Sequence, residues 1–91
     1  MMELKKEDYR IYAHDENDNL LAEITFPPVT KDKVVINHTY VAPQLRNQGI
    51  ADSLCHAAAD TIRENNLKCV ASCPYAIRWF DEHPDECDIL G

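Results

Sequence analysis

The stretch Val34–Leu54, VVINHTYVAPQLRNQGIADSL, combines the signs of a strand, a loop and the start of a helix. Its β-branched beginning predicts a strand over residues 34–41. Pro43 opens a loop that ends at Gly49, and a helix is predicted over about residues 49–65. A strand that enters a helix in this way directs free backbone N–H groups and the positive end of the helix dipole at one point. The stretch therefore predicts an anion site, typically one for a phosphate.

The predicted helix has one apolar face, because its apolar residues recur at i+4 spacing. Asp52 in the first turn and Arg63 in the last turn both suit the helix dipole. Asn65-Asn66 predicts a left-handed end to the helix. The apolar stripe consists of Ile50, Leu54, Ala58 and Ile62, with Ala51, Cys55 and Ala59 beside it.

Two strands are predicted before this stretch, at residues 8–14 and 20–26, where apolar and polar residues alternate. Residues 15–19 are rich in turn-forming types and are expected to join the two strands as a hairpin. Pro27-Pro28 should end the second strand, and residues 30–33 should form another turn. The polar residues 1–7 are expected to be frayed.

After the helix, residues 68–72 predict a short fourth strand and residues 76–83 a second, short helix. Ile77 and Phe80 are expected to face inward on that helix, and Pro84 should end it. In the third strand, period-two alternation places Val34, Ile36, His38 and Tyr40 on one face.

The order β-β-β-α-β-α predicts an α/β fold, namely an antiparallel β-meander followed by a β-α-β unit. The strands of that unit should be parallel, with a right-handed crossover, and a short helix should follow at the C-terminus. The carboxyl ends of parallel strands lie at one sheet edge, so we expect the loops at 42–49 and 72–75 to meet there. All 91 residues are expected to form a single domain, 1–91.

The charge and the apolar pattern exclude several functional classes. The net charge of −7 argues against nucleic-acid binding, which needs a basic surface. No apolar run approaches the roughly 20 residues that span a bilayer, and no signal peptide is evident, so a cytoplasmic location is expected. The acidic residues within 81–88 are either solvated surface or a feature that attracts a cationic amine.

Four cysteines raise the alternative of a zinc site. Reduced thiols are the default for a cytoplasmic protein, and the spacing lacks the usual pair of cysteines two residues apart. We therefore expect no metal, and Cys55 and Cys69 are expected to lie in the core. The zinc alternative would use Cys69, Cys73, His83 and Cys87.

The pattern Val41-x-Pro43-x-x-Arg46-x-Gln48-Gly49-Ile50-Ala51-x-x-Leu54 resembles the acetyl-CoA signature of the GNAT (general control N-acetyltransferase) superfamily. The core of that signature, Gln/Arg-x-x-Gly-x-Gly/Ala, is matched by Arg46, Gly49 and Ala51. Ile36-x-His38-Thr39-x-Val41 and Ser72-Cys73-Pro74-Tyr75, with His83-Pro84, resemble a minimal branch, the family of the human N-acetyltransferase domain-containing protein. Asn47 departs from the pattern, since many members have a second glycine there.

The resemblance implies a minimal GNAT fold whose third and fourth strands splay apart and hold the pantetheine of acetyl-CoA between them. It also implies that the pyrophosphate lies on the backbone N–H groups of about residues 48–51. Larger members have further elements that build the acceptor pocket, and this chain is too short for them. The cofactor-binding residues it implies are Tyr40, Val41, Ala42, Arg46, Asn47, Gln48, Gly49, Ile50, Ala51, Cys73, Pro74 and Tyr75.

The implied activity is acetyl-CoA-dependent N-acetyltransfer to an amine, either a small molecule or a protein lysine or N-terminus. His38 is the candidate base, because the ordinary pKa of histidine lies near neutrality. Cys73 is a candidate acid or nucleophile, and Tyr75 a candidate acid or cofactor-orienting residue. Each of the three could instead be structural. The alternative function is a coenzyme A-binding sensor or interaction module with little or no catalysis.

Overall fold

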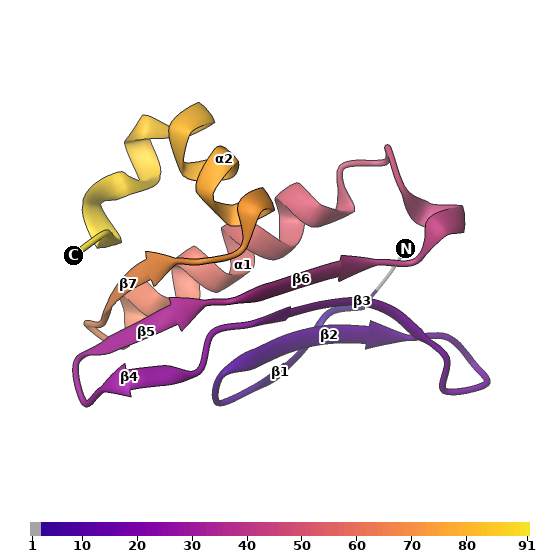
Figure 1. Ribbon diagram of the computed structural model, residues 1–91. Coiled ribbons are helices and arrows are strands. Elements are labelled where there is room, and N and C mark those ends of the chain that lie inside the picture. Colours follow the sequence, from indigo (N-terminus) through magenta and orange to yellow (C-terminus); the bar gives the residue numbers. More distant parts are fainter. Residues whose placement is uncertain (1–2) are drawn as a thin grey trace.

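The computed structural model describes residues 3–91 (Figure 1). Its strands are β1 (Lys5–Glu7), β2 (Arg10–His14), β3 (Leu20–Thr25), β4 (Pro28–Thr30), β5 (Lys33–Ile36), β6 (His38–Val41) and β7 (Lys68–Ala71). Its helices are α1 (Ile50–Glu64) and α2 (Pro74–Glu82), with 3-10 turns η1 (Pro43–Leu45) and η2 (Pro84–Ile89).

The strands form two sheets, one of four strands in the order β1-β2-β3-β6 and one of three in the order β4-β5-β7. The pairs in the larger sheet are antiparallel. β5 and β7 are parallel, from Lys33 opposite Lys68 to Ile36 opposite Ala71, and α1 connects them. The predicted α/β fold, with a meander followed by a β-α-β unit, is confirmed.

The core lies between the sheets and α1, which packs against β2, β3 and β6. Figure 1 shows both helices on the same side of the strands. The predicted apolar stripe of α1 is confirmed, because Leu54, Cys55, Ala58, Ala59 and Ile62 are all buried. The helix also ends as predicted, since Asn66 has a left-handed φ of 57°. Among residues 3–91, neither helix is long and apolar enough to cross a membrane.

The predicted third strand is wrong in one respect that affects the site. Asn37 divides it into β5 and β6, and its N–H donates to the Thr25 carbonyl oxygen at 3.3 Å. Val34 and Ile36 are buried before the break, whereas after it Thr39 lies opposite the buried Ile24. The alternation therefore shifts by one residue at Asn37.

This shift takes His38 and Tyr40 off the face of Val34 and Ile36, which they were predicted to share. They pair instead with Thr25 and Glu23, on the face of the sheet opposite α1. We call this the outer face; besides these four residues, it carries Arg10 and Tyr12 from β2.

Two short edge strands were also missed. Lys5–Glu7, predicted to be frayed, pairs with β2 through its backbone, so its exposed charged side chains do not oppose pairing. Pro28–Thr30 pairs with β5 even though Pro28 cannot donate. Proline is compatible with the first residue of an edge strand.

The second helix begins at Pro74, two residues earlier than predicted, because proline suits the first helical position. Ala76, Trp79 and Phe80 form its buried face at i, i+3, i+4 spacing. Phe80 is inward as predicted, but Ile77 lies off that face and is 47% exposed. The helix ends before Pro84 as predicted, and η2 follows it.

Candidate functional site

An opening in the strand layer lies between β6 and the segment that follows β7. The parallel pairing of β5 with β7 stops at Ile36, whose carbonyl oxygen accepts from the N–H groups of Ser72 and Cys73 at 3.0 and 3.3 Å. β6 then follows β3. Within the described chain, the edge of β6 that faces residues 72–75 has no strand paired with it. The predicted splay is present, and Figure 1 shows the chain after β7 turning into α2, away from β6.

The loop before α1 is built on two left-handed residues, Asn47 with φ 67° and Gly49 with φ 77°. Gly49 is the N-cap of α1 and provides no side-chain hydrogen bond to its first turn. The first N–H groups of an α-helix have no intrahelical acceptor. A Cβ built on Gly49 would meet nothing within 4 Å. Hence backbone conformation alone favours glycine here, and the space beside the helix N-terminus is free.

A cavity of about 450 Å³ occupies this region. Eight residues predicted to bind the cofactor line it, from β6, the loop and both helices. Thr39, Leu45 and Asp52 also line the cavity, although the sequence did not predict them; Asp52 was expected only to favour the helix dipole. The lining residues are Thr39, Tyr40, Val41, Leu45, Arg46, Asn47, Gly49, Ile50, Ala51, Asp52 and Tyr75.

Four of the predicted cofactor-binding residues are not part of this lining. Ala42 is buried, 3% exposed, and its N–H bonds to the Leu21 carbonyl oxygen at 2.8 Å. The exposed Gln48 turns its side-chain amide back to the Gln44 carbonyl oxygen at 3.4 Å. Cys73 and Pro74 start α2 beside the opening.

Arg46 is the basic residue of the lining. Its Nε donates to the carbonyl oxygen of Val41 at 3.1 Å. This bond holds the exposed guanidinium against the end of β6, and guanidinium nitrogens provide further donors suited to a phosphate. The cavity therefore combines a fixed cation with the N-terminus of α1.

Cys73 is the N-cap of α2, directly before Pro74, the first residue of that helix. Its Sγ lies 3.3 Å from Thr39 Oγ1, across the opening between the diverging segments. Burial alone would raise the pKa of the Cys73 thiol. Hydrogen bonds from the Thr39 side chain and from the N–H groups of Ala76 and Tyr75 outweigh it, so the pKa lies below its ordinary value. Cys73 is thus the thiol poised to ionise.

Replacing Thr39 with valine should make this thiol less reactive. Valine keeps the shape of threonine but removes the hydroxyl group, so burial should dominate and the pKa of Cys73 should rise. The expected result is slower alkylation of Cys73 by iodoacetamide at neutral pH, by several-fold. The measurement is the alkylation rate against pH, followed by peptide mass spectrometry. Thr30→Val, on the exposed edge strand β4, is the matched control; an unchanged Cys73 profile in Thr39→Val would contradict the role of the hydroxyl group.

The pKa values of Cys55, Cys69 and Tyr75 are shifted in the opposite direction. Burial raises the pKa of Cys55 to about 12 and that of Cys69 to about 11. This agrees with their predicted place in the core. The pKa of Tyr75 is raised by its burial and by the negative charge of Asp52 nearby. Tyr75, which lines the cavity, therefore keeps its proton more firmly than a free tyrosine.

His38 lies apart from these groups. Its side chain is half exposed on the outer face, with Nε2 3.3 Å from Glu23 Oε1. Arg10 bonds to the other carboxylate oxygen of Glu23. His38 is not among the cavity residues, although Tyr40, two residues further along the same face, is. The structure therefore brings Thr39, Cys73 and Tyr75 to the opening but places His38 outside it.

The alternative zinc set is not brought together. Among residues 3–91, Cys69, Cys73, His83 and Cys87 form no convergent group of metal-type ligands. Cys69 is buried, and Cys87 Sγ donates to the Phe80 carbonyl oxygen at 3.4 Å. Two of the C-terminal acidic residues already form ion pairs within the chain, because Arg63 bonds to Glu86 and Asp88.

Comparisons with known proteins agree with this fold. Protein NATD1 of Xenopus tropicalis is 35% identical over 63 residues, which are 69% of this chain and 58% of that protein. A GCN5-like protein of Staphylococcus aureus, solved by NMR, has a TM-score of 0.82 and 34% identity, covering 99% of this chain and 88% of that one. The ribosomal-protein-alanine N-acetyltransferase of Brucella melitensis biovar Abortus 2308 has a TM-score of 0.59 and 25% identity. The match covers 80% of this chain and 60% of that one.

The match to a family model spans nearly the whole chain. The model of the GCN5-related N-acetyl-transferase family covers residues 9–89, from the residue before β2 to the end of η2. This range includes the loop before α1, the splayed strands and the Cys73 segment. The resemblance read from the sequence motifs is confirmed, and the chain belongs to the GCN5-related N-acetyltransferase family.

Proposed function

We propose that this domain transfers an acetyl group from acetyl-CoA to an amine. The observation that carries the proposal is a single cavity that joins two features. Arg46 and Gly49 lie in its wall at the N-terminus of α1, and Tyr75 lies in its wall beside the opening between β6 and Cys73. The first feature suits a phosphate and the second suits the chemistry of a thiol ester.

The residues present fit the cofactor. The free space beside Gly49, which a Cβ would occupy, leaves room for a pyrophosphate close to the N–H groups of residues 50–52. Arg46 would bind a phosphate oxygen, and the unpaired edge of β6 near Tyr40 and Val41 would accept the pantetheine amides. Bound acetyl-CoA would supply an acetyl group activated as a thioester.

The remaining chemistry is proton transfer by this chain's own residues. The acceptor amine must lose a proton, and His38 is the base we assign to it, acting from the outer face. The departing thiolate must gain a proton, and Tyr75 can donate one because its raised pKa keeps it protonated. Cys73 could share that role. Its lowered pKa also suits a nucleophile that would carry the acetyl group before the amine does.

A second candidate function is a coenzyme A-binding module with little catalysis. The position of His38 favours it, because the predicted base pairs with Glu23 and is not in the cavity wall. Under this proposal the phosphate-binding features are used and the proton-transfer groups are not. A cytoplasmic location belongs to both candidates and is supported by four free cysteines, which suit a reducing compartment.

The cofactor site is tested by calorimetric titration of acetyl-CoA into the protein and its Arg46→Gln variant. A charge-assisted hydrogen bond contributes about 1.5–3 kcal/mol, so Arg46→Gln should weaken binding roughly 10- to 100-fold. Lys31→Gln removes the same charge from a turn outside the cavity and is the matched control. Equal affinity in the wild type and Arg46→Gln would remove Arg46 from the site.

Catalysis is tested separately, by following free thiol release with panels of small amines, lysine peptides and peptides with free N-termini. If the domain is an enzyme, at least one panel yields acetylated product, and His38→Gln and Tyr75→Phe lower kcat without loss of cofactor affinity. Cofactor binding with no acetylated product in any panel would favour the binding module instead. Absence of both binding and product would contradict both candidates.

A further inference from the structure

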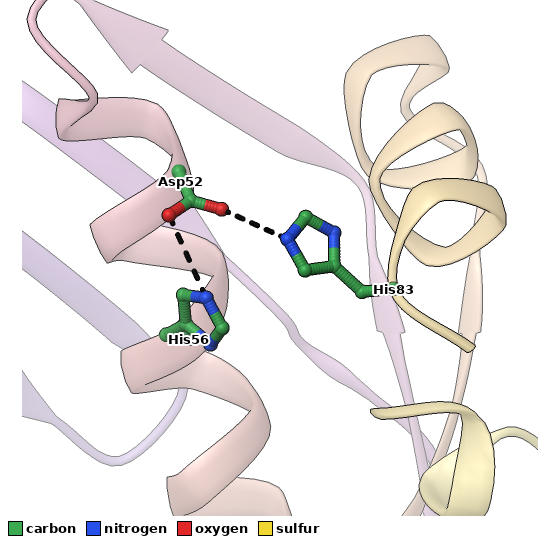
Figure 2. Close-up of side chains that lie close together, drawn as sticks. All are labelled: Asp52, His56 and His83. Atoms are coloured by element: carbon green, nitrogen blue, oxygen red, sulfur yellow. Dashed lines mark ion pairs between the residues drawn. The ribbon is translucent and has the colours of Figure 1, made fainter. Parts of the chain in front are cut away.

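A second group of chemically active side chains lies between the two helices, at the rim of the cavity. Asp52 and His56 are four residues apart and share one face of α1, and His83 follows the end of α2 (Figure 2). One ligand-type atom of each lies within 4.8 Å of those of the other two. Among residues 3–91, this is the one convergent group of three or more His, Cys, Asp or Glu side chains.

The hydrogen bonds of the two histidines direct both Nε2 atoms at the same carboxylate. His83 Nδ1 lies 2.7 Å from the Trp79 carbonyl oxygen, which can only accept, so Nδ1 carries the proton. His56 Nδ1 is similarly 3.2 Å from Glu86 Oε2. In the neutral rings, the lone pairs of both Nε2 atoms then face Asp52, at 3.3 Å from Oδ1 for His83 and 3.5 Å from Oδ2 for His56.

Two ring nitrogens and a carboxylate that face one another in this way can bind a single cation together. The two rings are close enough for this, because the ring centroids of His56 and His83 are 5.4 Å apart. The ligands of a tetrahedral zinc, with bonds of about 2.0–2.1 Å, lie roughly 3.3 Å apart, close to the two distances between Nε2 and the Asp52 carboxylate.

The surrounding residues hold each candidate ligand as partners of metal ligands commonly do. Histidines that bind metals usually donate their other N–H to a carboxylate or a backbone carbonyl, and here these are Glu86 and Trp79. Trp79 Nε1 donates to Asp52 Oδ1 at 2.7 Å, and its ring stacks on His83 with centroids 4.4 Å apart. Arg63 in turn holds Glu86 at 3.0 Å.

From this geometry we infer that Asp52, His56 and His83 bind a divalent transition-metal ion of the zinc class. Two imidazoles and one carboxylate suit zinc and its neighbours better than magnesium or calcium, which prefer oxygen ligands. All three side chains are partly exposed, so a water or a small ligand could complete the coordination. Because Asp52 also lines the cavity, the metal would lie at its rim. The inference depends only on these three side chains and their partners, and not on whether the domain transfers acetyl groups.

This site differs from the zinc alternative considered from the sequence. His83 belongs to both sets, but its partners are residues of α1 rather than cysteines. Asp52 and His56 share a helix face by their spacing, yet His83 lies 27 positions after His56 and 31 positions after Asp52 in the sequence. Only the packing of α2 against α1 joins them.

The inference is tested by calorimetric titration of Zn²⁺ into the protein and its variants. The wild type should bind one Zn²⁺ per chain, and His56→Gln and His83→Gln should each lose more than about 100-fold in affinity. Glu86→Gln, which removes a supporting partner, should lose about 10- to 100-fold. His14→Gln, on β2 and outside the cluster, should bind like the wild type.

Two further measurements separate this site from binding by thiols and from misfolding. Cys73→Ser and Cys87→Ser should keep the wild-type Zn²⁺ affinity, and circular dichroism should be unchanged in every variant. In the wild type, Zn²⁺ should shift the imidazole Nε2 resonances of His56 and His83 but not those of His14. The inference is overturned if the wild type binds no Zn²⁺, if binding depends on the cysteines, or if those two resonances do not move.

Discussion

Replacing Gly49 with asparagine should lower the affinity for coenzyme A by at least about tenfold while leaving the fold nearly as stable as before. Gly49 has a left-handed φ of 77°, a conformation that asparagine tolerates better than other residues with a side chain. The added Cβ meets nothing within 4 Å in the protein alone. It would, however, occupy the space in which we place the pyrophosphate, and lost phosphate contacts of about 1.5–3 kcal/mol correspond to roughly 10- to 100-fold.

The comparison with Gly49→Ala separates the two roles of this glycine. Alanine introduces the same Cβ but tolerates the left-handed conformation less well, at a cost of about 1–2 kcal/mol. Calorimetry should therefore show weakened coenzyme A binding in both variants, whereas urea unfolding should show a clear loss of stability only for alanine. If both variants bind like the wild type, the pyrophosphate does not lie against the N-terminus of α1.

Replacing Ile62 with alanine should destabilise the domain by about 2–5 kcal/mol, the usual cost of a cavity left by a buried aliphatic side chain. Ile62 is fully buried on the inner face of α1, in the core shared with β2 and β3. A protein of this kind has a free energy of unfolding of about 5–15 kcal/mol, so this substitution should remove a large part of it. Urea denaturation followed by circular dichroism measures the change.

Ile77→Ala is the matched control for this prediction, because it makes the same chemical change on the other helix. Ile77 is 47% exposed on α2, and surface substitutions usually change stability by no more than about 0.5 kcal/mol. A loss at Ile77 as large as that at Ile62 would mean that α2 packs with a different face inward.

The elements with a repeating pattern were predictable from the sequence. The i+4 apolar stripe of α1 predicted its buried face, since the spacing alone determines which side of a long helix can face a core. The strand–loop–helix order also predicted the parallel pairing of β5 with β7 and the loop that ends at Gly49. These features depend on local sequence and on the general handedness of such connections.

The features that were missed depend on contacts between distant segments. The break at Asn37 comes from its pairing with Thr25 of another strand, and period-two alternation does not encode it. For that reason, the outer-face position of His38 could not be foreseen. In α2, Ile77 and Phe80 are equally apolar, and only the packing of the helix decides which of them is buried.

The shift at Asn37 also limits where the chain length can vary. Deleting Asn37 would let the alternation run on unbroken from Ile36, and His38 would stay outward and Thr39 inward. Inserting or deleting one residue within β6 would instead turn Thr39 away from Cys73. The turn at residues 15–19, far from this point in the sheet, carries no such constraint. Length changes in this domain should therefore be tolerated in its hairpin turns but not within β6.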